Sequence, residues 1–256
     1  MLERESPYIK SKKEIEIIAQ GGKLLGEILL RLSRMVKPGI TTKELSDEAE
    51  RQIVKIGGRP SFKGYGNRKN PFPAALCVSI NDEVVHGVPT NARALRGGDI
   101  VGLDIGMEYQ GLYTDTAITV GVGKISPLAQ KLITTTKKSL DSAIAAAKEG
   151  NRMGDVGFEA QFVAERNGFS VVRDLVGHGV GYAVHEDPEV PNYGRPGTGI
   201  ILAEGMVLAI EPMLCEKSYK VMMDEDGWTI RTVDRGLSAH FEHTIVVGRN
   251  GGRILT

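Results

Sequence analysis

The 256-residue sequence contains little cysteine, has no net charge and lacks any long hydrophobic segment. Its two cysteines, Cys77 and Cys215, are too few for a disulfide framework or a zinc-thiolate cluster, so a reducing, cytoplasmic setting is expected. The 32 basic residues balance the 32 acidic ones, which gives no reason to expect a specific nucleic-acid partner. No stretch approaches the roughly 18 apolar residues of a membrane span, and the charged N-terminus argues against a signal peptide. We therefore expect a cytoplasmic globular protein with no membrane partner.

The order of predicted elements occurs twice along the chain. Apolar residues at helical spacing, together with capping patterns and stop signals, predict helices over 11–36, from 41 to the glycines at 57 and 58, over 126–148 and over 154–167. Strand patterns follow each pair of helices. Because no linker rich in Ser, Pro or Gly interrupts the chain, we expect one domain over residues 1–256, with halves at about 11–121 and 126–248.

Strand segments of the two halves also align with each other. Residues 98–104 match residues 205–211, and residues 115–121 match residues 242–248. A repeat of two helices followed by antiparallel strands predicts an α+β fold with a pseudo-two-fold axis. Strands should lie at its centre and helices outside.

Acidic residues occupy equivalent positions in the two halves. Asp104 aligns with Glu211, and Asp115 aligns with Glu242, each beside a strongly apolar strand. Because a two-fold axis brings equivalent strands together, these four carboxylates should converge at the centre of the sheet. Ionised carboxylates within a few ångströms raise one another's pKa, and a divalent cation relieves the repulsion. The pattern favours a metal site over the alternative of exposed acids at strand ends.

His178, in the segment Gly-His-Gly-Val-Gly, is a candidate fifth ligand, although alone it would equally suit a core or turn position. One imidazole and four carboxylates form a hard donor set, which favours Mn, Fe or Co over thiolate-bound structural zinc. Five protein ligands exceed what one catalytic metal normally takes. We therefore expect two metals that share carboxylates.

Two further histidines, His86 and His185, lie in similar contexts, VVHGVP and AVHEDP. The His-Gly-Val at His86 also matches that at His178. Neutral imidazole beside a metal site can position a substrate or transfer a proton. The alternative is that both are histidines of surface loops.

Seven segments of the chain carry distinctive motifs: SFKGYG, FPAALCVSINDEVVHGVP, DIVGLDIG, YTDTAITV, GHGVGYAVHEDP, GMVLAIEP and SAHFEHTIVV. With them the chain resembles the type I methionine aminopeptidases, of the pita-bread fold, from about residue 12 to residue 248. The resemblance implies an enzyme that hydrolyses the N-terminal methionine from nascent polypeptides, with a small second residue preferred. It also implies two divalent metal ions (Co, Mn, Fe or Zn), a monomer, and transient contact with the ribosome.

The resemblance implies a role for each candidate metal ligand. The ligands would be Asp104, Asp115, His178, Glu211 and Glu242. Asp115 and Glu242 would bridge both metals, and Asp104 would complete one of them. A water shared by the metals would be the nucleophile, because paired cations lower the pKa of such a water to roughly 7.

The resemblance also implies which residues would act on the peptide. Glu211 would accept the proton of the water, and His185 would stabilise the carbonyl as it becomes tetrahedral. His86 would contact the peptide beyond its first residue. The methionine side chain would lie against Tyr65, Phe72, Cys77 and Trp228.

Two positions depart from the family's pattern. Val184 stands where an aromatic side chain is familiar, and His240 stands where an amide is more common. Side chains alternate along a strand, so His240 should share a face with Glu242, about 7 Å away, and lie beside the metal site. The alternatives are an exposed histidine and an additional metal ligand. An imidazole there would add a pH dependence near its usual pKa of about 6.5.

Two other functions remain as alternatives. A proline-directed (Xaa-Pro) peptidase of the same fold would share the five ligands, but such enzymes normally add a large N-terminal domain. A non-catalytic homologue that binds the ribosome or RNA would typically lose ligands, and all five are present here.

Overall fold

The computed structural model describes residues 8–256. The charged residues Glu3, Arg4 and Glu5, which argue against a signal peptide, lie outside the described residues. Within 8–256, no helix is long and apolar enough to cross a membrane.

The helices of the described chain begin and end close to the predicted positions. They are α1 (Lys12–Met35), α2 (Thr42–Lys55), α3 (Pro127–Ala146) and α4 (Met153–Arg166). Ser11 and Thr41 cap the first two helices through complete capping boxes with Glu14 and Glu44. Ser126 caps α3 and is followed by a proline at the first helical position. The sequence patterns for these helices are therefore confirmed.

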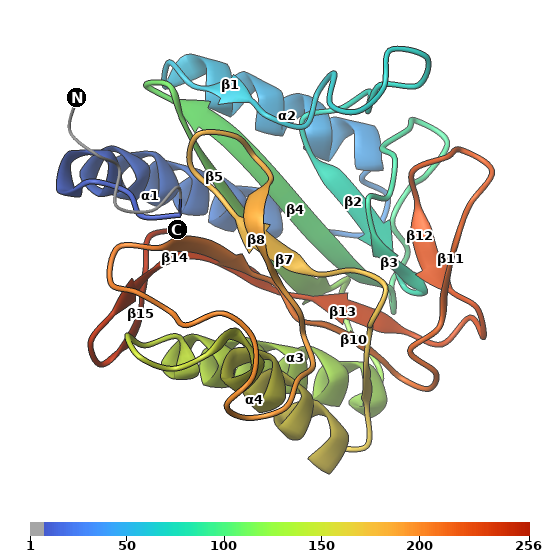
Figure 1. The fold of residues 1–256 in the computed structure, drawn as a ribbon. Helices are drawn as coiled ribbons and strands as arrows, with labels where there is room; N and C mark the ends of the chain where they lie inside the picture. Colours follow the sequence, from blue (N-terminus) through green and yellow to red (C-terminus); the bar gives the residue numbers. More distant parts are fainter. Residues whose placement is uncertain (1–7) are drawn as a thin grey trace.

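Most strands belong to one antiparallel sheet (Figure 1). The strands are β1 (Arg59–Pro60), β2 (Cys77–Ile80), β3 (Glu83–Val85), β4 (Ile100–Tyr109), β5 (Leu112–Gly121), β6 (Ser170–Val171), β7 (Gly177–Gly179), β8 (Glu186–Val190), β9 (Val207–Ile210), β10 (Met213–Cys215), β11 (Val221–Met223), β12 (Ile230–Thr232), β13 (Ser238–His240), β14 (Glu242–Gly248) and β15 (Gly251–Ile254). The order of the main sheet is β1-β4-β5-β14-β9-β7-β8, with β2 on β4 and β15 on β14. Two small sheets, β13-β10-β6 and β11-β12-β3, lie beside it.

The pseudo-two-fold axis passes between β5 and β14, which pair with each other at the centre of the main sheet. On one side of this pair follow β4 and β2, and on the other side follow β9 and β7. Helices α1 and α2 pack on the first half of the sheet, and α3 and α4 pack on the second (Figure 1). The predicted α+β fold with central strands and outer helices is confirmed.

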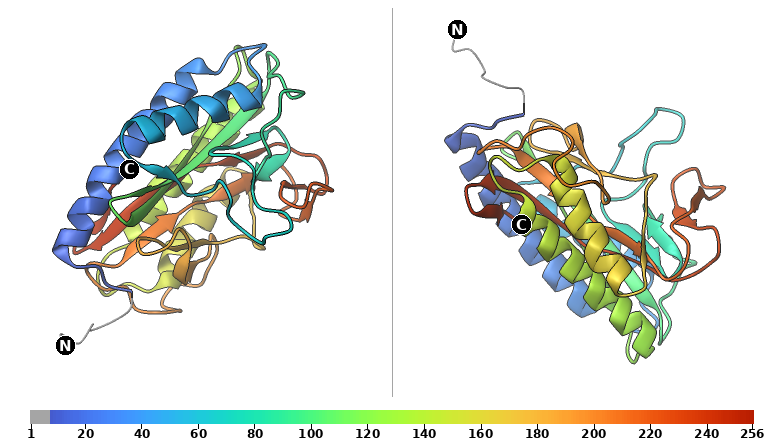
Figure 2. Two further views of the ribbon diagram at one scale, coloured as in Figure 1. Left: turned by 90° about the horizontal axis from the view of Figure 1, so that it is seen from above. Right: turned by 60° about the horizontal axis from the view of Figure 1, so that its bottom comes forward.

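Alternation along the strands decides which side chains face the helices. On β4, Leu103 and Ile105 are fully buried in the core beneath α1 and α2, so Asp104 between them faces the other way. On β9, Ile210 packs in the core beneath α3 and α4, so Glu211 also faces away from the helices. Figure 2 shows the segment after β1 and the β11–β12 hairpin projecting on the side of the sheet away from α1.

One match between the two halves is wrong. His178 pairs with Ala209 of β9. In the repeat, Ala209 corresponds to Gly102, and Gly102 pairs with Ser79. The first-half counterpart of His178 is therefore Ser79. His86 instead follows β3, which belongs to one of the small sheets. The shared His-Gly-Val is a local similarity with no structural equivalence.

Candidate metal centre and substrate pocket

Four carboxylates converge near the pseudo-two-fold axis. Ala117 of β5 is paired with Asp104 on one side and with Glu242 on the other, so these three residues form a row across the sheet. Asp115 lies two residues before Ala117, on the same face of β5. Glu211 directly follows β9, which pairs with β14. The small side chain at position 117 leaves space between the acids.

The donor atoms form two groups that overlap. One group consists of Asp104, Asp115 and Glu242, and the other of His178, Glu211 and Glu242. In each group the candidate ligand atoms lie within 4.8 Å of one another. Because Glu242 belongs to both, its carboxylate is placed to connect two neighbouring ions.

His178 is oriented as a metal ligand requires. Its Nδ1 lies 2.9 Å from the carbonyl oxygen of Gly179, so Nδ1 carries a proton and donates it to that oxygen. The Nε2 atom then keeps its lone pair and lies 3.5 Å from Oε1 of Glu211. Metal-bound histidines are commonly held by such a hydrogen bond from the other ring nitrogen. Burial lowers the pKa of His178 to about 3, which keeps the imidazole neutral and able to bind a cation.

The carboxylates lack the partners that their burial demands. Oxygen atoms of Asp104 (Oδ1), Asp115 (Oδ1) and Glu242 (Oε1) are buried without a hydrogen-bond partner in the described chain. Burial raises the pKa of Asp104 to about 7. Burial, and then repulsion by neighbouring carboxylates, raises the pKa of Asp115, Glu211 and Glu242 well above the ordinary range. A hard divalent cation would satisfy these oxygens and remove the protons, so the residues present fit a divalent metal site.

His185 and His86 lie at the edge of this cluster. The ring of His185 is 4.4 Å from that of His178, and its Nδ1 is 2.6 Å from the hydroxyl oxygen of Tyr65. Asp115, His178 and His185 form a third group of candidate ligand atoms, which the sequence did not suggest. His86 has a left-handed backbone with φ of 58°, and burial lowers its pKa to about 4.

His240 lies beside the site, as strand alternation predicts. It is 3% exposed, and its Nε2 is 3.6 Å from Oε2 of Glu211. Burial, and then the neighbouring His86, lowers its pKa to about 3. The expected pH dependence near 6.5 is therefore wrong, because the buried imidazole stays neutral across that range.

A cavity of about 140 Å³ opens onto the carboxylates, and all the predicted pocket residues line it. The predicted lining consists of Tyr65, Phe72, Cys77 and Trp228, with His86 and His185 at the same cavity. Phe62, Val85, Leu175, Val176 and Met213 also line it and were not predicted. Of these, Phe62 and Val85 stood in motifs noted from the sequence.

The apolar end of the cavity is built from aromatic and sulfur-containing side chains. The rings of Phe72 and Trp228 meet edge to face with centroids 5.3 Å apart. Cys77 is buried in the same cluster, and burial raises the pKa of its thiol, which stays protonated. Val184, where an aromatic residue was familiar, packs in this cluster as well.

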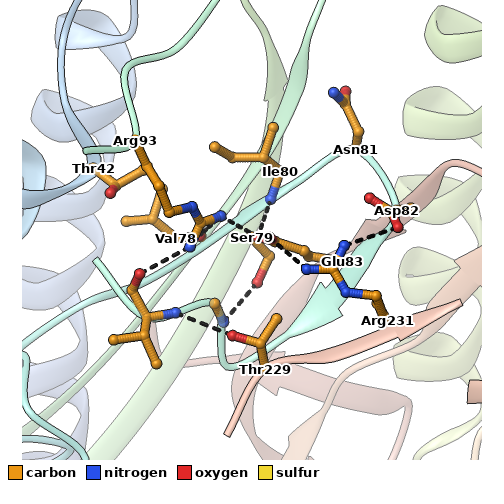
Figure 3. A network of polar contacts seen from close by, with 12 residues as sticks. Thr42, Val78, Ser79, Ile80, Asn81, Asp82, Glu83, Arg93, Thr229 and Arg231 are labelled. Carbon is orange, nitrogen blue, oxygen red and sulfur yellow. Dashed lines mark hydrogen bonds and ion pairs between the residues drawn. The ribbon is translucent and has the colours of Figure 1, made fainter. Parts of the chain in front are cut away.

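An ionic network holds the turn that carries His86 (Figure 3). Glu83 is buried, and its carboxylate accepts a hydrogen bond from Arg93. Arg93 also donates to the carbonyl oxygen of Val88, two residues beyond His86, at 2.8 Å. Arg231 of β12 donates to the other oxygen of Glu83 at 3.4 Å. The network therefore connects the His86 turn to the β11–β12 hairpin.

The sequence is similar to those of known metallopeptidases. The model of metallopeptidase family M24 matches residues 16–249. The chain is 51% identical to a methionine aminopeptidase of Clostridium perfringens, over 97% of this chain and 98% of that protein. It is 45% identical to methionine aminopeptidase 1 of Bacillus subtilis, over 96% of this chain and 98% of that protein.

Solved structures show the same similarity. A methionine aminopeptidase from Thermotoga maritima superposes with a TM-score of 0.93 at 45% identity, covering 97% of this chain and 98% of that one. An X-Pro aminopeptidase from the same organism superposes with a TM-score of 0.75 at 21% identity, covering 97% of this chain and 62% of that one. The second likeness shows a shared fold only.

Proposed function

The chain belongs to metallopeptidase family M24, and from this premise we infer that it is a metal-dependent aminopeptidase that removes N-terminal methionine from polypeptides. Two methionine aminopeptidases share 51% and 45% identity with this chain over nearly their whole length. The observation that carries the chemistry is the position of Glu242 in two overlapping groups of buried donor atoms.

We propose that the site holds two divalent ions. Asp104, Asp115 and Glu242 would hold one, and His178, Glu211 and Glu242 would hold the other. Asp115, as a further bridging ligand, follows from the resemblance to the family. Co, Mn, Fe and Zn all suit this donor set of oxygen and one imidazole nitrogen. Bound there, the ions would polarise the scissile carbonyl and lower the pKa of the attacking water.

We propose that Glu211 moves the proton during the reaction. Its carboxylate lies among the candidate ligands and lines the cavity, so it is placed to accept a proton from the attacking water. The same carboxyl group would then return the proton to the leaving amine. His185, hydrogen-bonded to Tyr65 and in ring contact with His178, would donate to the carbonyl oxygen as negative charge develops on it.

The cavity gives the proposed preference for methionine a physical basis. A methionine side chain is flexible, and its sulfur is attracted to aromatic rings at about 5 Å. Phe72 and Trp228 supply such rings, and Cys77 adds a soft, neutral thiol. His86 also lines the cavity, and it would contact the chain beyond the first residue. A preference for a small second residue belongs to the same proposal.

We further propose that residues 1–256 form one catalytic domain that acts as a monomer in the cytoplasm and meets nascent chains at the ribosome only transiently. The balanced charge and the two buried free cysteines support a reducing compartment and no specific nucleic-acid partner.

A metal titration with two substrates tests the function. The metal-free protein should gain activity on Met-Ala-Ser when Mn, Fe, Co or Zn is added in turn, and the stoichiometry should approach two ions per chain. An Ala-Pro peptide should be cleaved poorly, which separates this function from that of a proline-directed peptidase. Metal binding with no turnover of either peptide would instead favour a non-catalytic homologue.

A further inference from the structure

The loop that carries His185 is closed by the side chain of the next residue. Oε1 of Glu186 accepts hydrogen bonds from the backbone N–H groups of Tyr182 and Ala183, the second at 2.7 Å. The other oxygen, Oε2, accepts a hydrogen bond from Nζ of Lys10 at 2.7 Å. Both carboxylate oxygens of Glu186 are thus used to hold the loop between β7 and β8.

Lys10 reaches this loop from a segment 176 residues away in sequence. Its side chain is 1% exposed, and its backbone N–H donates to the carbonyl oxygen of Gly205 at 3.0 Å. Its Nζ also lies 4.1 Å from the centre of the Tyr182 ring. Gly181 has φ of 144°, and a Cβ atom there would lie 2.5 Å from Cε of Lys10. The lysine therefore fits tightly against the loop backbone.

A buried ammonium group is costly unless it is paired, and a single removed partner leaves an uncompensated charge. The pairing of Lys10 with Glu186 meets this requirement and at the same time fixes two backbone N–H groups of the loop. His185 is the residue before Glu186, and it must be oriented toward the cavity to contact both Tyr65 and His178.

We propose that Lys10 and Glu186 are positioning residues for the reaction, which fix the loop so that His185 is aligned with the substrate carbonyl. The proposal rests on the proposed function, because the ion pair affects the reaction only if His185 acts on the substrate. A group held even about 1 Å from its productive position can cost roughly 100-fold in rate. Lys10, just before α1, is therefore part of the apparatus that orients the site.

A double-mutant cycle tests the link to His185. Lys10→Met in the full-length, metal-loaded protein should lower kcat on Met-Ala-Ser by about 10- to 100-fold, with a smaller change in KM. In a His185→Ala background, the same substitution should lower kcat by less than about twofold, because the group it orients is gone. An equal loss in both backgrounds would show that the ion pair acts without His185 and would overturn the proposal.

Two further variants separate positioning from the cost of an unpaired charge. Lys10→Met combined with Glu186→Gln removes both charges, and kcat should stay low because the loop has lost its anchor. Recovery of the wild-type kcat in this double variant would contradict the proposal. It would show that the defect of Lys10→Met came from the unpaired carboxylate of Glu186. Lys13→Met, at an exposed lysine in the first turn of α1, should retain the wild-type kcat.

Hydrogen exchange gives a readout that does not depend on activity. The amides of Tyr182 and Ala183 should exchange at least about tenfold faster in Lys10→Met than in wild type, while amides of β4 should be unchanged. Unchanged exchange in the loop would overturn the anchoring role. If the wild-type protein failed to cleave Met-Ala-Ser, the proposed function would fall, and the exchange measurement would still decide whether Lys10 anchors the loop.

Discussion

The carboxylate cluster should make the metal-free protein less stable as the pH rises. Burial raises the pKa of Asp104 from 3.8 to about 7. A pKa that is higher in the folded state gives stability below pH 3.8, and this stability is lost as the pH rises through about 7. At 1.36 kcal/mol per pKa unit the full loss is about 4 kcal/mol, of which roughly 2.5 kcal/mol falls between pH 5 and pH 7.5. The raised pKa values of Asp115, Glu211 and Glu242 act in the same direction.

The difference between wild type and Asp104→Asn isolates this effect. Thermal unfolding of both metal-free proteins would be measured at pH 5 and pH 7.5. At roughly 2–4 °C per kcal/mol, the Tm of the variant should gain about 5–10 °C relative to wild type between the two pH values. Asp141→Asn, at an exposed acid of α3 whose side chain is 49% exposed, should follow wild type. Added Mn should raise the Tm of wild type at pH 7.5 much more than that of Asp104→Asn. The same Tm difference between the two metal-free proteins at pH 5 and at pH 7.5 would refute the reasoning.

Three further predictions concern the reaction and the mature chain. Glu211→Gln and His178→Ala should each lower kcat on Met-Ala-Ser at least roughly 100-fold at saturating metal, and a near-wild-type rate in folded Glu211→Gln would exclude its role in proton transfer. Leu2 is too large for the proposed second-residue preference, so intact mass spectrometry should find Met1 retained in protein from a host with ordinary processing. His240→Gln should leave the pH–rate profile from about pH 5.5 to 8.5 unchanged, because burial lowers the pKa of this imidazole to about 3. An inflection near pH 6.5 that disappears in the variant would contradict it.

The fold could be predicted because its signals are local and occur twice. The capping boxes at Ser11 and Thr41 depend only on residues three positions apart, and both are present. The repeat then related Asp104 to Glu211 without any knowledge of tertiary contacts. The false match of His86 with His178 shows the limit of this argument, because a shared tripeptide does not determine which strands pair.

The remaining parts of the site depend on contacts between distant segments. Phe62 reaches the cavity because β1 pairs with β4, and a Cβ atom on Gly106 would lie 2.7 Å from Cε1 of that ring. Leu175 and Met213 line the cavity from segments whose sequences carry no special pattern. For His240, strand alternation gave the correct face, but the burial that lowers its pKa arises from packing that periodicity does not encode.

The frame of the site is symmetric, but its chemical groups are not, and this asymmetry gives the reaction a direction. Each aspartate of the first half corresponds in the repeat to a glutamate of the second, whose carboxylate stands one methylene further from the backbone. The imidazole of His178 comes from one half only, and at the equivalent position Ser79 accepts a hydrogen bond from the N–H of Gly87, beside His86. A site with two identical halves would accept a peptide in either orientation. Here the two ends of the bond to be cleaved meet different groups. The substrate peptide is therefore bound in one orientation, with its amino terminus at the site.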